Sequence, residues 1–259
     1  MIVKTDAVVL RTMKYRESSR IATLYTRDSG KMSVIAKGIR EHASRFGGSL
    51  DVLAYVSVVV YRKEHRDLQL LTRCDMKKPF RHLSEEIDRM AAALAAIELL
   101  DAVTHAAEEN APLFTLLVET LDAIDSAARN VVSPLLFFEL HLLAALGYRP
   151  NVAACFRCGA PLEADDAGPA RYALNSGSGG LYCDGCAPEG AAAETVSAGT
   201  LRSLQHLQAL GAPHDAARVA LSPRIREEVS WTLRRLLQCH VEGLRPSKSE
   251  AVFAALAQS

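Results

Sequence analysis

The chain has 259 residues and no net charge at pH 7, with 49% hydrophobic and 23% charged residues. This balance describes a folded protein and excludes an intrinsically disordered chain. The longest apolar run, residues 90–100, contains Glu98 and is shorter than the ~18 residues that a membrane span needs. The first residues carry charges and lack the apolar core of a signal peptide, so we expect a cytoplasmic protein with no membrane contact.

The neutral total conceals an uneven distribution of charge along the sequence. Residues 1–80 contain 16 basic and 8 acidic residues, a balance of +8, whereas residues 81–150 have a balance of −7 and residues 151–259 one of −1. A basic segment of this kind is typical of a module that binds nucleic acid or another anionic partner. A solvated charged face without a ligand would have the same composition, so this alternative stays open.

The first segment, residues 1–79, contains five short stretches rich in apolar, β-branched and tyrosine residues. Turn-forming residues separate them, which is typical of strands joined by loops. The predicted strands are 2–10, 21–26, 32–37, 52–61 and 68–75. Five strands without a convincing crossover helix predict a small closed barrel, and the five-stranded OB-fold is the leading candidate. An SH3-like barrel and a sandwich fragment remain as alternatives.

The segments 80–150 and 191–259 have apolar residues at helical spacing. The predicted helices are 83–107, 113–128, 134–146, 198–210 and 223–241, with a short helix or tail at 246–259. Ser133 and Ser222 are candidate N-caps, because a serine hydroxyl accepts a hydrogen bond from the first turn of a helix. His141 lies within an apolar helix and has no second ligand at metal spacing, so we expect a packed histidine.

Four of the six cysteines form two pairs, Cys155-x2-Cys158 and Cys183-x2-Cys186, with 24 residues between the pairs. This spacing is typical of a tetrahedral site for one Zn²⁺, and four sulfur ligands leave no open position for a substrate. We therefore expect a structural zinc finger at residues 151–190, with 171–174 and 180–182 as the arms of a hairpin. Two redox-active pairs and a disulfide framework are the alternatives.

The predicted fold class is therefore α+β multidomain: an OB-fold barrel followed by an all-α domain that contains an inserted zinc finger. The sequence contains no P-loop, no G-x-G-x-x-G after a strand, no G-x-S-x-G and no H-E-x-x-H. The paired acids, such as those at 85–86 and 227–228, are adjacent and point in different directions on a helix. We predict that the protein is not an enzyme.

A succession of short blocks runs through the first 160 residues. It comprises Tyr15-Arg-Glu-Ser-Ser-Arg-Ile, Leu24-Tyr-Thr-Arg-Asp-Ser-Gly-Lys31, Ala36-Lys-Gly38, Tyr61-Arg-Lys, Phe138-Glu-Leu-His-Leu-Leu and Leu146-Gly-Tyr-Arg-Pro150. In order and spacing these blocks resemble the RecO family of bacterial recombination mediators, and the four cysteines extend the likeness to residue 186.

The resemblance implies binding of single- and double-stranded DNA and annealing of complementary strands coated with single-strand-binding protein (SSB). It also implies work with RecR to load RecA onto SSB-covered DNA, in the cytoplasm and at the nucleoid. The family binds the acidic C-terminal tail of SSB on its helical part, for which the sequence offers basic candidates. These are Arg129, Arg149, Arg234 and Arg235.

An OB barrel binds nucleic acid with basic side chains along the backbone and aromatic rings against the bases. The candidates for DNA contact lie in the loops and strand ends of the first segment. They are Arg16, Arg20, Lys31, Lys37, Arg40, Arg45, Phe46, Arg62, Lys63 and Arg66, with Tyr15, Tyr25 and Tyr61 as further rings. The long basic loop 38–48 is the strongest candidate, while Tyr25 alternates with apolar neighbours and is favoured as a core residue. The alternative function is a zinc-containing transcription or RNA-binding module.

Overall fold

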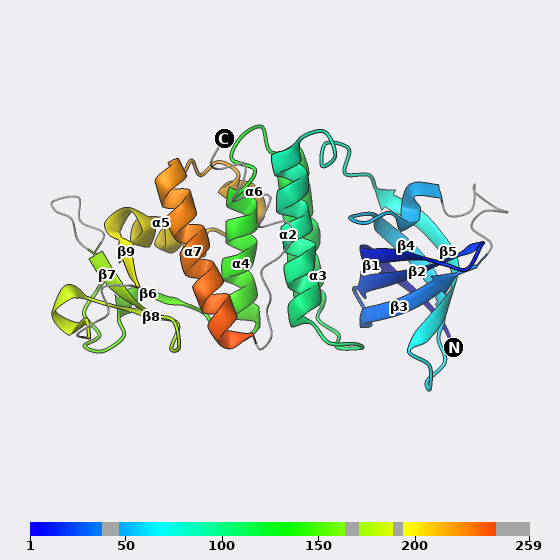
Figure 1. Cartoon of the computed structure of the whole chain (residues 1–259), viewed down its shortest axis with the longest axis horizontal. Helices are drawn as coiled ribbons and strands as arrows, with labels where there is room; N and C mark the ends of the chain where they lie inside the picture. Colours follow the sequence, from blue (N-terminus) through cyan, green and yellow to red (C-terminus); the bar gives the residue numbers. More distant parts are fainter. Residues whose placement is uncertain (38–46, 164–170, 189–193, 242–259) are drawn as a thin grey trace. The chain divides into compact units, whose positions relative to one another are not determined.

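The computed structural model describes residues 1–37, 47–163, 171–188 and 194–241. The chain forms two compact units, the first spanning Met1–Ser126 and the second beginning at Ala127 (Figure 1). The domain boundaries that the sequence suggests, at residues 79, 150 and 190, stay a prediction. Each unit is taken by itself below.

A closed barrel of five strands forms the first part of unit one (Figure 1). Its strands are β1 (Ile2–Tyr15), β2 (Ser19–Thr26), β3 (Gly30–Ala36), β4 (Tyr55–Tyr61) and β5 (Leu68–Lys78). The order around the barrel is β1-β2-β3-β5-β4, closed by antiparallel pairing of β1 with β4, and only β3 and β5 run parallel. The predicted OB-type barrel is confirmed.

Strict alternation of apolar and polar residues makes the barrel. Along β3 and β4 every second residue is buried, and these residues meet the inward side chains of the other strands in one core. β1 is five residues longer than predicted, because a bulge between Val9 and Arg11 lets its first half pair with β4 and its second half with β2. The prediction was wrong for residues 52–54, where Leu53 has a φ of +74° and begins no strand.

Two helices, α2 (Ile87–Val103) and α3 (Ala111–Ser126), complete the first unit. They cover one end of the barrel's outer surface, where the ring of Tyr25 packs against Phe114 with a centroid distance of 6.3 Å. The backbone of Glu108 approaches Gly30 so closely that a Cβ atom there would lie 2.1 Å from the Glu108 carbonyl oxygen. Gly30 also has a φ of +63°, so this turn requires glycine on both grounds.

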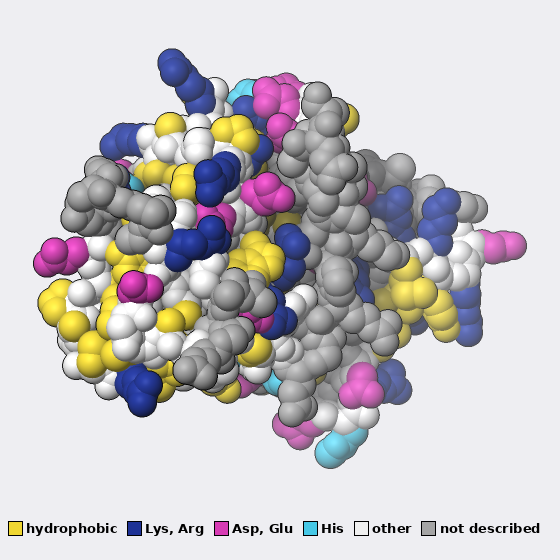
Figure 2. Space-filling model, turned by 60° about the vertical axis from the view of Figure 1, so that its left-hand side comes forward, with side chains coloured by type: hydrophobic (Ala, Val, Ile, Leu, Met, Phe, Trp, Pro, Cys, Tyr) yellow, Lys and Arg dark blue, Asp and Glu magenta, His cyan; other side chains and the backbone are white. Residues whose placement is uncertain are grey.

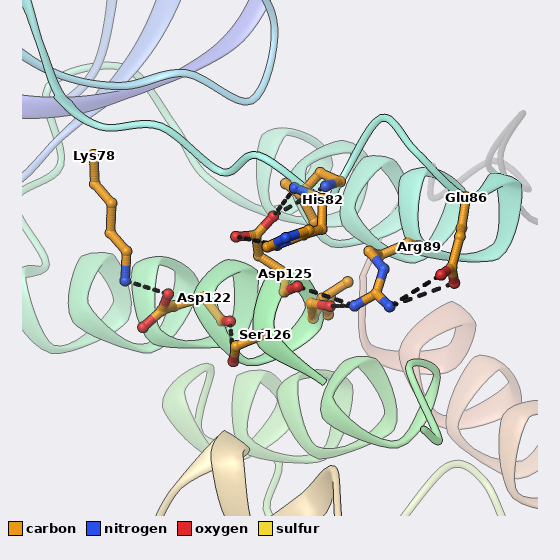
Figure 3. Close-up of polar contacts among 9 residues, drawn as sticks. Lys78, His82, Glu86, Arg89, Asp122, Asp125 and Ser126 are labelled. Atoms are coloured by element: carbon orange, nitrogen blue, oxygen red, sulfur yellow. Dashed lines mark hydrogen bonds and ion pairs between the residues drawn. The ribbon is translucent and has the colours of Figure 1, made fainter. Parts of the chain in front are cut away.

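The segment before α2 is tied to α3 by the carboxylate of Asp125 (Figure 3). The backbone N–H groups of His82 and Leu83 donate to its Oδ1 atom at 2.7 and 3.0 Å. The Arg89 guanidinium donates to the carbonyl oxygens of residues 124 and 125 at 2.7 and 3.0 Å. These bonds hold the segment in turns, so the helix begins at Ile87 and the predicted start at residue 83 was wrong.

In its described residues the second unit combines four helices with a small sheet (Figure 1). The helices are α4 (Ser133–Ala145), α5 (Ala198–Ala209), α6 (Pro213–Ala216) and α7 (Pro223–His240). The strands are β6 (Asn151–Cys155), β7 (Arg171–Asn175), β8 (Gly180–Tyr182) and β9 (Thr195–Ser197), in the order β6-β8-β7-β9. β7 and β8 pair antiparallel, which confirms the predicted hairpin.

The helix α4 is buried on nearly all sides, so its apolar sequence forms the centre of this unit. His141 stacks on Phe137 at 3.8 Å, and its Nδ1 atom lies 2.9 Å from the Phe137 carbonyl oxygen. Burial lowers the pKa of His141, so the ring packs as a neutral group, and the prediction of a packed histidine is confirmed. Ser222 caps α7 as predicted, whereas Ser133 lies inside α4 and donates its hydroxyl to Val219 instead.

Basic, acidic and apolar side chains are interspersed over the second unit, on the left of Figure 2, without a large field of one sign. This mixture agrees with the near-neutral balance of residues 151–259. Among the described helices, none combines the length and the apolar character that crossing a bilayer requires.

Candidate nucleic-acid interface and candidate metal centre

The predicted DNA contacts in the described loops form two groups at opposite ends of β1. Tyr15 pairs with Ser19, which places the β1–β2 turn, 16–18, at the C-terminal end of β1, and the pairing of Arg20 with Ala36 puts the end of β3 beside it. Tyr61 pairs with Ile2, which places the β4–β5 loop, 62–67, at the N-terminal end of β1. The first group carries Arg16, Arg20 and Lys37, and the second carries Arg62, Lys63 and Arg66. In OB-folds the corresponding two loops bind oligonucleotides together with the face of the second and third strands.

The β1–β2 turn and the end of β3 present three of these cations. Arg16 has a φ of +53° at the tip of the turn, and its guanidinium lies 5.4 Å from the centroid of the exposed Tyr15 ring. Arg20 is half-buried and forms an ion pair with Asp51 at 3.3 Å. Lys37 is exposed at the point where β3 ends.

A buried glutamine organises the β4–β5 loop. The Gln69 side chain accepts the backbone N–H of Lys63 at 2.7 Å and donates to the carbonyl oxygens of Lys63, at 3.0 Å, and Arg66. The exposed side chains of Lys63 and Arg66 therefore project from a loop whose backbone is fixed. The sequence analysis missed Gln69; the available signal was a polar residue at an inward position of an otherwise apolar strand.

Lys31 lies near the opposite end of its strand from Lys37. Its ammonium group donates to the side chain of Asp101 in α2 at 3.1 Å and to the carbonyl oxygen of the same residue at 2.7 Å. The buried Asp101 carboxylate also pairs with Arg11. The ammonium group of Lys31 is paired with Asp101 of α2, unlike those of the exposed loop lysines. Its contact with DNA stays a prediction.

The aromatic candidates include one buried ring and two exposed rings. Tyr25 is completely buried against α3, which confirms its core assignment, whereas Tyr15, before the β1–β2 turn, and Tyr61, before the β4–β5 loop, are exposed. The Lys63 ammonium lies 5.8 Å from the centroid of the Tyr61 ring. Arg40, Arg45 and Phe46, with most of the loop 38–48, lie outside the described residues.

The four paired cysteines meet in the small sheet of the second unit. The sulfur atoms of Cys155, Cys158, Cys183 and Cys186 all lie within 4.8 Å of one another, and those of Cys158 and Cys183 are 3.8 Å apart. Four sulfurs at the ~2.3 Å zinc–sulfur distance, placed at the corners of a tetrahedron, are about 3.8 Å apart. All four cysteines are free thiols, so the geometry fits a metal ion and not the disulfide alternative.

Local backbone geometry brings each pair of sulfurs together. The first pair follows β6 in a turn that ends at Gly159, whose φ is +73° and whose N–H bonds to the Cys155 carbonyl oxygen at 2.9 Å. The second pair flanks a short 3-10 turn, Asp184–Cys186, directly after β8. The N–H of Cys183 points to the Cys155 sulfur at 3.4 Å, so one knuckle donates to a ligand of the other.

The protonation of these thiols also favours a bound cation. Burial raises the pKa of Cys155, but backbone N–H groups of Cys158, Cys183 and Arg157 outweigh it and lower the pKa to about 6. Hydrogen bonds in which the Cys186 thiol donates its proton toward Cys158 and Cys183 raise the pKa of Cys186 to about 12. Four thiolates at this spacing need a cation between them, so the residues fit a metal ion with four sulfur ligands.

Contacts around two of the four basic residues considered for the SSB tail are defined in the second unit. Arg149 is exposed beside Tyr148, which stacks on His240 at 4.2 Å. Arg235 forms an ion pair with Glu194. The location of a tail-binding pocket therefore stays open.

Two protein-family models match the chain, and together they cover most of its length. Residues 1–80 match the family described as Recombination protein O N terminal, and residues 84–250 match the family described as Recombination protein O C terminal. The chain belongs to the RecO family. The resemblance inferred from the sequence blocks is thereby confirmed, and it extends over both the barrel and the four-cysteine sheet.

Three similar proteins carry the name DNA repair protein RecO. That of Anaeromyxobacter sp. (strain K) is 37% identical over 239 residues, which cover 92% of this chain and 91% of the relative. The Heliobacterium modesticaldum protein is 32% identical over 242 residues, covering 93% and 86%. The Salinibacter ruber protein is 31% identical over 258 residues, covering 98% and 94%. The likeness to RecO proteins thus spans nearly the whole of each chain.

Proposed function

We propose that this RecO-family protein is a DNA repair and recombination mediator that binds DNA through the basic loops of its barrel. The observation that carries the proposal is the set of basic side chains on the β1–β2 turn, on the β4–β5 loop and at the end of β3 of one closed barrel. Lysine and arginine side chains in such loops neutralise phosphates and release condensed counterions, which supplies sequence-independent affinity. The DNA repair names of the relatives support the same proposal.

Strand annealing follows from this surface without nucleotide hydrolysis. Two complementary strands repel each other through their phosphates, and a basic surface that neutralises both lowers this repulsion until base pairing drives the reaction. The absence of a P-loop from the sequence agrees with such a mechanism. We propose that the strands are presented coated with SSB, whose C-terminal tail docks on the helical part, and that RecR acts with this protein to load RecA.

We further propose that the four cysteines hold one Zn²⁺ with a structural role. The ion, when bound, supplies charge neutralisation and a cross-link between the two knuckles, and the four sulfurs occupy every tetrahedral position. The protein itself orients the ligands through the turn at Gly159 and through the hydrogen bond from the Cys183 N–H to the Cys155 sulfur. We assign no catalytic turnover to the protein, and we place its work in the cytoplasm, at the nucleoid.

The direct test is annealing of two complementary oligonucleotides, each coated with SSB and labelled so that pairing changes their fluorescence, in the absence of ATP. We expect faster annealing with the protein than with SSB alone. Repeating the experiment with two complementary RNA strands of the same sequence tests the alternative of an RNA-binding module. Acceleration for RNA but not for DNA would contradict the recombination proposal.

A further inference from the structure

Helix α5 carries two glutamines, one turn apart, on the side that contacts the small sheet of the second unit (Figure 1). The side-chain amide of Gln205 donates to the carbonyl oxygen of Val152 at 2.9 Å and to that of Leu162 at 3.0 Å. The amide of Gln208 donates to the carbonyl oxygen of Pro150 at 2.9 Å. Both hydrogens of the Gln205 amide are therefore used on backbone that flanks the first cysteine pair.

The two carbonyl groups that Gln205 joins lie on the two arms of one hairpin. The Cys155 N–H donates to the carbonyl oxygen of Ala160 at 2.8 Å near the tip of this hairpin. Further from the tip, the Leu162 N–H donates to the carbonyl oxygen of Ala153 at 2.9 Å. The first cysteine pair occupies the tip, so the glutamine amide closes the base of the hairpin, next to its last backbone hydrogen bond.

The pairing of β6 with the rest of the sheet is interrupted beside the first cysteine pair. Strand β8 pairs with Asn151 through Gly180 and with Cys155 through Leu181, so the register shifts and β6 bulges between these two positions. Val152 lies in this bulge and is buried. A buried carbonyl oxygen needs a hydrogen-bond donor, and the glutamine of α5 supplies it.

The second cysteine pair is held in a different way. It follows β8 directly, and β8 lies inside the sheet, between β6 and β7. The N–H groups of Cys186 and Ala187 close its turn by donating to the Cys183 carbonyl oxygen at 3.0 and 3.1 Å. The first pair lies at the end of the edge strand β6, so its position depends on a side chain from another element.

We propose that Gln205 is a positioning residue for the metal centre: by closing the hairpin of the first cysteine pair, it arranges two of the four sulfur ligands before an ion binds. The inference rests on the proposed zinc site. An ion that binds a loosely ordered hairpin must also order it, and the entropy lost in that step weakens the binding. A hairpin that is already closed at its base binds the ion more tightly and releases it more slowly.

The test measures metal affinity and metal release in matched variants of the full chain. Gln205→Leu removes both donors with little change in helix preference, and Gln205→Glu keeps the shape but replaces the amide by a group that only accepts. Gln208→Leu is the control, because it removes the same kind of bond between the same helix and the backbone, at Pro150, outside the hairpin.

Co²⁺ is the spectroscopic probe, because its visible absorption reports tetrahedral coordination by four thiolates. Displacement of bound Co²⁺ by added Zn²⁺ gives the zinc affinity of each variant. Transfer of Zn²⁺ to an excess of a strong chelator gives the rate of release.

We expect both Gln205 variants to bind Zn²⁺ about tenfold more weakly, at the lower end of the effect of residues that orient metal ligands. Release should be faster by a similar factor, whereas the Co²⁺ spectrum at saturation should keep its four-thiolate form, because all four ligands are intact. Gln208→Leu should keep the affinity and the release rate within about twofold of the unmodified protein. Unchanged affinity and release in the Gln205 variants, or an equal loss in Gln208→Leu, would overturn the proposal.

The outcomes separate this inference from the zinc assignment. If the unmodified protein gave no four-thiolate Co²⁺ spectrum, the zinc assignment would fail and this inference with it. If it gave that spectrum and the Gln205 variants matched Gln208→Leu, zinc binding would stand and Gln205 would only pack α5 against the sheet. Thermal melting followed by circular dichroism shows that each variant is folded, and Gln205→Glu carries the test if Gln205→Leu does not fold.

Discussion

The barrel and the four-cysteine sheet are both small β structures, but they are held together by different means. In the barrel each strand has two hydrogen-bonded neighbours, and a core of inward side chains fills the interior. In the sheet of the second unit the strands are three to five residues long, and the two knuckles meet around sulfur atoms. The barrel is therefore held by its own core, whereas we propose that the sheet is stabilised by a metal ion bound to the four sulfurs.

The largest expected effect is loss of the metal. Cys155→Ser removes one of four ligands and should abolish stoichiometric zinc binding, with a loss on the order of 10 kcal/mol of binding free energy that is coupled to local folding. Hydrogen exchange should become fast in β6 and β8 and stay slow in the barrel strands. Ser222→Ala, which removes a helix cap in the same unit, is the control and should retain the metal.

Thiol titration of the unmodified protein gives an independent measure of the same site. Cys239 is exposed and should react at once, while Cys74 is buried in the barrel, where burial and then the charge of Asp75 raise its pKa to about 12. Addition of a strong chelator should release the four paired cysteines and leave Cys74 unreactive until the barrel unfolds. Reaction of the paired thiols before chelation would contradict a bound metal.

A cavity in the barrel core should have a smaller but still large effect. Leu24 is fully buried, so Leu24→Ala is expected to lower the free energy of unfolding of the barrel by about 2–5 kcal/mol. Urea denaturation with and without the substitution measures the loss, and zinc content should be unchanged. Met76→Ala on the exposed side of β5 should cost less than about 0.5 kcal/mol.

The carboxylate of Glu228 should give the second unit a pH-dependent stability. It accepts hydrogen bonds from the hydroxyl groups of Ser197 and Thr200 at 2.6 and 2.7 Å and from the Ser197 N–H at 2.9 Å. Burial raises the pKa of Glu228, but these bonds outweigh it, and the pKa lies below the ordinary 4.5. The stabilisation is therefore present above pH 4.5 and is lost as the pH falls through the lowered pKa.

Glu228→Gln is accordingly expected to reduce stability by about 1–2 kcal/mol at pH 7, because the amide replaces a charged acceptor. The difference from the unmodified protein should shrink as denaturation is repeated at lower pH toward 4. Glu227→Gln, at the exposed neighbouring position, is the matched control and should show little change at either pH. A difference that did not depend on pH would mean that Glu228 stabilises the fold by packing alone.

The smallest expected effect concerns Lys31. Because its ammonium group bonds to Asp101 in α2, Lys31→Gln should lower the stability of the first unit by about 1–2 kcal/mol. Its DNA affinity should change by less than about twofold, as no phosphate contact is removed. A loss as large as that from a loop lysine would return Lys31 to the DNA-binding surface and contradict its separation from the loops.

The comparison of the two regions also explains what the sequence could predict. Stretches of strand-forming residues between turn signals located all five strands of the barrel, and the cysteine spacing located all four sulfurs of the cluster, since both signals are local in sequence. The length of β1 was underestimated, because a bulge that serves two partner strands leaves no local pattern. The helix start at Ile87 was missed for a similar reason, because it depends on Asp125, which is some 40 positions away.

In the candidate interface, too, contacts between residues distant in sequence could not be predicted. Charge and loop position predicted Arg16, Lys63 and Arg66, and the structure places them on the β1–β2 turn and on the β4–β5 loop. Lys31 looked equivalent in sequence, but its partner Asp101 lies 70 residues later.

One measurement tests most directly the claim that DNA is bound by the barrel loops and that the four-cysteine sheet is structural. It is the affinity for (dT)20 of the double variant Lys63→Gln with Arg66→Gln beside that of Cys155→Ser, read by anisotropy over a range of salt concentrations. The loop variant should bind at least about tenfold more weakly and have a salt slope lower by about 1.4. Cys155→Ser should keep both the affinity and the slope of the unmodified protein. Loss of DNA binding by Cys155→Ser with the barrel still folded, or full binding by the loop variant, would contradict the account.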